Sequence, residues 1–216
     1  MNMKTVVLGT LLIIILGIGG LVYRNAVEHP TRPIACPLDA KVCPDGTTIG
    51  RSGLSCSFPA CPPPNVSLDQ IGLAFALPQD FAAVSETDVV IVASYQAPEG
   101  AGHGPLSIGI RQYALSASST ALAIIQSTAI SGTSGKSVPT TAYSSVTIGG
   151  HRFTVVPIER FEGVVHTAYY LTRAGDVLRF DAIDHDAMGW TDPTLDVSTL
   201  PAQAALRAML STLQAE

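Results

Sequence analysis

The sequence predicts an α+β fold: an antiparallel sheet with packed helices, preceded by a transmembrane helix and a small disulfide-stapled hairpin. Three observations predict it. An uncharged apolar run occupies 6–22, all four cysteines cluster within 36–61, and β-branched segments with two amphipathic helical segments follow residue 67. The expected parts are an anchor over 1–24, a stapled module over 35–61, a proline linker over 62–66 and an α+β domain over 67–216.

Composition indicates a folded and acidic protein. The 216 residues are 47% hydrophobic and only 13% charged, which excludes a disordered chain. From Ser67 onward, seven Lys and Arg face fourteen Asp and Glu, so the domain carries about −7. Nucleic-acid binding needs clustered Lys and Arg, so no nucleic-acid partner is expected.

The apolar run from Val6 to Val22 has the length of a short membrane span. With Thr5 and Tyr23 it reaches about 19 residues, near the roughly 20 that a bilayer requires. A cleaved signal peptide is the first alternative, although its apolar part is usually shorter and ends at a small-residue site. A lipoprotein signal ending at Cys36 is the second. We interpret the run as an uncleaved signal anchor.

The cysteines decide the orientation of this anchor. Lys4 and the amino terminus are nearly balanced by Arg24 and Arg32, so charge alone leaves the orientation open. Four cysteines in one short segment are typical of an oxidising compartment. The sequence therefore predicts a single-pass protein of the cell membrane whose C-terminal body is extracytoplasmic.

The cysteine module has the spacing C-x6-C-x12-C-x4-C. Zinc ligands usually pair as C-x2–4-C, and the first pair, Cys36 and Cys43, is further apart, so two disulfides are expected and no metal. Residues 44–46, Pro-Asp-Gly, predict a turn followed by a short strand. Four cysteines allow three connectivities, which the sequence leaves open. Our choice among them is Cys36–Cys56 with Cys43–Cys61.

Two resemblances concern this module. The pattern from Cys36 to Pro62 resembles a small module found beside membrane anchors in uncharacterised bacterial proteins, and it implies no activity. Residues 43–47, Cys-Pro-Asp-Gly-Thr, resemble part of Kazal-type protease inhibitors, which normally have six cysteines rather than four. A stapled stalk is the preferred interpretation, and an inhibitor is an alternative.

The domain sequence alternates between strand and helix patterns. Hairpin turns are expected at Gly149-Gly150 and at 173–175. The last helix carries an apolar stripe of Leu206, Met209, Leu210 and Leu213. The expected strands are 73–77, 88–95, 106–113, 145–148, 152–158, 164–172 and 176–183, and the expected helices run from 118 or 119 to 129 and from 199 onward.

This order of elements resembles the Mog1/PsbP-like domain over about 67–213. The resemblance is carried by Phe75, Leu77-Pro78 and Phe81, by the turn at 147–150, by the hairpin from Tyr169-Tyr170 to Gly175 and by the closing helix. Members of that family are mostly binding or assembly proteins, so the resemblance implies a non-catalytic role.

Candidate functional residues gather in one acidic stretch, 181–186, and in the loop after it. Asp184, His185, Asp186 and Trp190 are the predicted binding residues. No nucleophile elbow or phosphate-binding loop occurs, so we expect no catalytic residues and no cofactor. The expected function is binding of an envelope protein or small ligand; the alternative is a hydrolase using the Asp181–Asp186 region.

Overall fold

The computed structural model describes residues 3–28, 35–43, 47–85, 90–100 and 104–215. They belong to two compact units. One unit comprises Met1–Asp39 and Arg51–Ser57, and the other comprises Ala40–Gly50 and Phe58–Glu216.

The N-terminal apolar run forms one helix, α1 (Met3–Glu28). The apolar side chains that the structure describes in this helix are exposed, as at Ile13 with 72% and Leu16 with 67%. Within the described residues, no helix combines the length and apolar character that crossing a bilayer requires. The anchor therefore stays a prediction of the sequence.

Disulfides join Cys36 to Cys56 and Cys43 to Cys61, which confirms our choice among the three connectivities. Strands β1 (Ala40–Val42) and β2 (Thr48–Gly50) pair antiparallel, so the predicted hairpin is confirmed. Its turn at 44–46 lies outside the described residues. Most hairpin side chains are exposed, and Cys43 is the buried one at 3%. A hairpin with so little buried surface depends on its cross-links.

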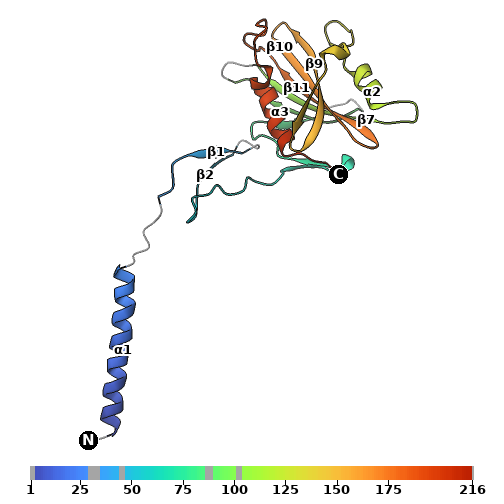
Figure 1. Cartoon of the computed structure of the whole chain (residues 1–216). Coiled ribbons are helices and arrows are strands. Elements are labelled where there is room, and N and C mark those ends of the chain that lie inside the picture. Colours follow the sequence, from blue (N-terminus) through green and yellow to red (C-terminus); the bar gives the residue numbers. More distant parts are fainter. Residues whose placement is uncertain (1–2, 29–34, 44–46, 86–89, 101–103, 216) are drawn as a thin grey trace. The chain divides into compact units, whose positions relative to one another are not determined.

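A seven-stranded antiparallel sheet forms the centre of the larger unit (Figure 1). Its strand order is β5-β6-β7-β11-β10-β9-β8, which confirms the α+β prediction. The bounds are β5 Ala82–Val84, β6 Ile91–Ala97, β7 Leu106–Ala114, β8 Ser144–Ile148, β9 His151–Phe161, β10 Val164–Thr172 and β11 Asp176–Asp184.

A second sheet of three short strands lies in the same unit. Its order is β12-β4-β3, with β3 at Val66–Leu68, β4 at Leu73–Phe75 and β12 at Gln214–Ala215. The segment around 73–77 was expected as a strand, but β3, β5 and β12 were not. Asn65 also joins this region, because its amide N–H and side chain bond the backbone of Phe75 and Leu77.

Two helices pack on opposite faces of the large sheet. Alternate residues of β11 point to opposite faces, so Leu178 and Phe180 meet α3 (Pro201–Ser211), while Val177 meets α2 (Ala121–Thr128). Helix α3 buries its predicted stripe, including Leu206 at 0% exposure. The short 3-10 helices are η1 (Asp69–Ile71), η2 (Thr140–Ala142) and η3 (Val197–Thr199).

Candidate functional site

A hollow of about 300 Å³ opens on the α3 side of the sheet, where β9 and β10 meet η3. Val165, Thr167 and Tyr169 alternate along β10 into it, and Val155 and Pro157 come from β9. The remaining lining residues are Ala142, Ser144, Glu159, Arg160, His166, Val197 and Ser198. Apolar walls with a few polar groups are typical of sites for small ligands.

A β-bulge shapes this hollow. The register between β9 and β10 shifts between His166, opposite Glu159, and Thr167, opposite Pro157, so that Ile158 has no partner across the pair. Pro157 has no N–H to give to the ladder, and proline within a sheet is commonly found at such irregular positions. The sequence therefore interrupts the ladder beside the hollow.

Arg160 holds the loop after β11 beside the hollow. The Arg160 guanidinium donates hydrogen bonds to the carbonyls of Gly189, Trp190 and Asp192. The Trp190 ring meets Phe161 edge to face, with ring centroids 6.4 Å apart. Trp190 and Val197 also pack against a small cluster containing Val165, so the loop and the hollow share apolar contacts.

The predicted binding residues do not converge on one point. Asp184 is 1% exposed, and its Oδ1 accepts a hydrogen bond of 2.7 Å from the Ala202 N–H at the start of α3. Asp186 is exposed with a φ of 53°, and the His185 carbonyl accepts a bond from Gly104. Trp190 is half-buried against the neighbours of its own loop. Among the described residues, no three His, Cys, Asp or Glu side chains gather as metal ligands.

A cluster of charged side chains around the buried Asp181 lies on the opposite, α2 side of the sheet. Asp181, 1% exposed, accepts hydrogen bonds at Oδ1 from Arg179 Nε at 2.8 Å and from His166 Nε2 at 2.7 Å. Arg111 Nη1 donates to the other carboxylate oxygen. Arg179 also donates to the Thr128 carbonyl at the end of α2, where a cation is favoured by the helix dipole.

This cluster sets the ionisation of its members. Burial by itself would raise the pKa of Asp181, but the hydrogen bond from His166 and the charges of Arg179, His166 and Arg111 outweigh it and lower the pKa to about 2. Burial raises the pKa of Tyr170, beneath Arg179, to about 12. Asp181 is therefore ionised and Tyr170 neutral at physiological pH.

Sequence reasoning noted Asp181 only as part of an acidic stretch and missed its partners. One signal was available at Gly109, a glycine inside a strand pattern, which often marks a place where another group lies close to the backbone. A Cβ there would lie 3.5 Å from Arg111 Nη1 and 3.8 Å from Asp181 Cβ.

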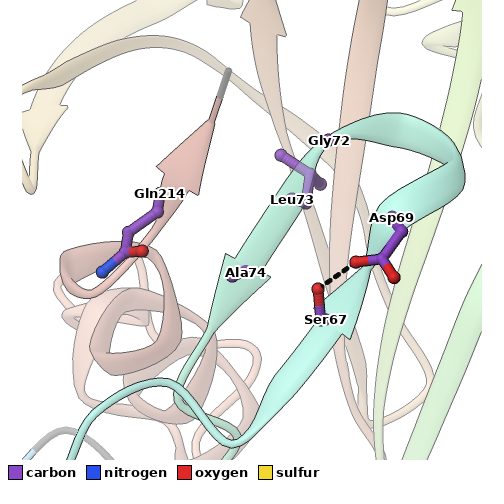
Figure 2. Close-up of a pocket in the computed structure, with 6 residues that line it drawn as sticks. All are labelled: Ser67, Asp69, Gly72, Leu73, Ala74 and Gln214. Carbon is purple, nitrogen blue, oxygen red and sulfur yellow. Dashed lines mark hydrogen bonds between the residues drawn. The ribbon is translucent and has the colours of Figure 1, made fainter.

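The described residues also line other hollows. One of about 190 Å³ lies beside β4 and is lined by Ser67, Asp69, Gly72, Leu73, Ala74 and Gln214 (Figure 2). Its polar side chains Ser67 and Asp69 bond each other, as a local turn does (Figure 2). Another, of about 410 Å³, lies near the start of α3 and includes Phe81, Leu106 and Pro201, with Asp80 and Glu99 also in its lining.

Comparison with known proteins adds little to this geometry. No family model matches the chain, and no curated protein matches it. A crystal structure from Bacteroides thetaiotaomicron VPI-5482 is similar, with 13% sequence identity and a TM-score of 0.44. The match covers 67% of this chain and 45% of that one, so the chain spans less than half the length of this neighbour.

Proposed function

We propose that the α+β domain is a non-catalytic binding module that takes a small amphipathic ligand, or an apolar side chain of an envelope protein, into the hollow between β9, β10 and η3. The observation that carries the proposal is the hollow itself, which exposes mostly apolar surface and a few polar groups. Hydroxyl groups come from Ser144, Thr167 and Ser198, and Glu159, Arg160 and His166 add titratable side chains. A binding role also agrees with the resemblance to the Mog1/PsbP-like domain.

The alternative, a hydrolase using 181–186, finds less support in the contacts of its carboxylates. Asp181 is bonded by two arginines and a histidine, and the low pKa of its carboxyl makes it a poor general acid or base near neutral pH. Asp184 bonds the first turn of α3. Both side chains make hydrogen bonds that would have to break before either could take part in a reaction.

Filling the hollow tests the binding proposal. Ser144 lines the hollow from exposed strand β8, while its neighbour Ser145, also exposed, is absent from the lining and provides a matched control. With 1-anilinonaphthalene-8-sulfonate as the probe, we expect Ser144→Phe to weaken binding by roughly tenfold, which corresponds to about 1.4 kcal/mol. Ser145→Phe is expected to leave the fluorescence titration unchanged.

Equal titrations for the two variants would contradict the hollow as the binding site. So would a wild-type protein that does not bind the probe at one site per chain. Thermal unfolding of both variants checks that the substitutions leave the fold intact, and phenylalanine keeps Trp190 as the single tryptophan of the chain.

We further propose that the chain is held in the cell membrane by the run 6–22, with the module and domain outside the cytoplasm. In bacterial cells that express the full chain, we expect the protein to remain in the membrane pellet after alkaline carbonate washing. External protease should degrade it in spheroplasts. Release by carbonate would contradict the anchor, and protection from the protease would contradict the orientation.

A further inference from the structure

We infer that the α2 side of the sheet carries a second binding site, for a small oxyanion such as a carboxylate or phosphate group, centred on Arg111. Arg111 does not line the hollow on the α3 side, although His166 and Glu159 border both. The inference rests on the hydrogen-bonding capacity of Arg111, the charge around it and the small residues beside it.

The two arginines of the buried cluster are bonded differently. Arg179 donates from Nε to Asp181 and from Nη1 to Thr128, and its Nη2 lies 2.7 Å from the same carboxylate. Arg111 donates from Nη1 alone, to Asp181. Within the described part of the chain, the Nε–Nη2 edge of Arg111 makes no hydrogen bond to protein, and its side chain is 28% exposed.

That edge is the part of a guanidinium that holds a carboxylate or phosphate. Its two N–H groups are parallel and match two oxygens of one anion, so both bonds form together. Arg111 is also held in place, because its Nη1 is already bonded to a carboxylate that is 1% exposed. The two donors on this edge are therefore partly preorganised for an anion that binds them.

The charges on this face favour an anion despite the acidic domain. The single charge of Asp181 is shared by two guanidinium groups, so these three side chains together carry one positive charge in excess. Glu159 of β9 lies opposite His166, and Ser131 and the Thr133 N–H donate hydrogen bonds to its carboxylate. That hydrogen bonding lowers the pKa of Glu159, so the glutamate is ionised, and strands β10 and β11 separate it from Arg111 on β7.

The strand residues beside Arg111 have small side chains, and the guanidinium lies over one of them, since a Cβ at Gly109 would lie 3.5 Å from Arg111 Nη1. Ser107 and Gly109 precede it on the same face of β7, and Ser94 pairs with Gly109 from β6. None of these side chains extends as far as an arginine, and Ser107 and Gly109 are partly exposed. Ser94 and Ser107 also bring hydroxyl groups, which can donate to an oxyanion.

The test uses the full-length chain and NMR titration with acetate or inorganic phosphate, against sodium chloride at matched ionic strength. We expect saturable shifts of the Arg111 side-chain N–H and of the Ser107 and Gly109 amides with at least one of the two anions. Arg111→Lys keeps a charge beside Asp181 but removes the paired donors, and is expected to weaken binding about tenfold.

Arg152→Lys provides the matched control, because Arg152 is an exposed arginine of β9 outside the cluster. It should titrate like the wild type, and so should Ser144→Phe, which separates this site from the hollow. The inference would be overturned if sodium chloride produced the same chemical-shift changes as acetate and phosphate. It would also be overturned if the Arg111→Lys protein bound both anions as the wild type does. The relative response to acetate and phosphate identifies which oxyanion the site prefers.

Discussion

Replacing Asp181 with alanine is expected to lower the free energy of unfolding by about 3–5 kcal/mol, the range for removing one partner of a buried ion cluster. Arg179, with a side chain 8% exposed, would lose the carboxylate that accepts a hydrogen bond from its Nε and forms an ion pair with its Nη2. Arg111 and His166 would lose the same partner. Urea unfolding followed by Trp190 fluorescence measures the change.

A matched control for this prediction is Asp186→Ala. Asp186 is exposed, and it lies only five positions away in the chain. A surface substitution of this kind usually changes stability by less than about 0.5 kcal/mol, although the φ of 53° at Asp186 adds a small cost for alanine. A loss below about 1 kcal/mol for Asp181→Ala would contradict the view that the cluster stabilises the fold.

The same carboxylate predicts an acid-dependent loss of stability. The pKa of Asp181 is about 2 in the folded state, against 3.8 for an ordinary aspartate. Its contribution of roughly 2 kcal/mol is therefore complete above pH 4 and is lost as pH falls from about 4 toward 2. The stability difference between the wild type and Asp181→Ala should shrink across this window.

Replacing Cys43 and Cys61 with serine is expected to unfold the β1–β2 hairpin. The disulfide closes a loop with a sequence separation of 18, for which chain entropy predicts a loss of roughly 3 kcal/mol. The hairpin strands bury no side chain completely, so no apolar core replaces the cross-link. Limited proteolysis should then cut within 40–61, where the wild type resists.

The large sheet gives the control for this experiment, because it contains no cysteine. Trp190 fluorescence and thermal unfolding of the α+β domain should stay as in the wild type. A hairpin that resists protease equally well without the Cys43–Cys61 bridge would contradict the prediction.

The long elements were predictable because their periodicity extends over many residues. Strands β7, β10 and β11 have nine residues each, and their alternation of apolar positions identified them within one or two residues. Strands β3 and β5 have three residues each, too few to establish a period of two. Their pairing is decided by neighbouring strands distant in sequence, as when Gln214 pairs with Ala74.

The candidate sites were less predictable. Arg111 and Asp181 are 70 positions apart, and only the pairing of β7 with β11 makes them neighbours. The hollow likewise depends on a register shift at Pro157, whose position in a strand the sequence shows but whose partners it does not. The acidic stretch was visible, yet its Asp181 faces α2 and its Asp184 meets α3.

By itself the sequence determined the α+β class, the stapled hairpin and the order of the main elements. These follow from the hydrophobic period, turn chemistry and cysteine spacing, which depend only on residues close together in the chain. The tertiary structure alone decided the strand order, the hollow at the bulge and the cluster around Asp181. The reason is that strand pairing and side-chain burial depend on contacts between distant segments, which no local pattern specifies.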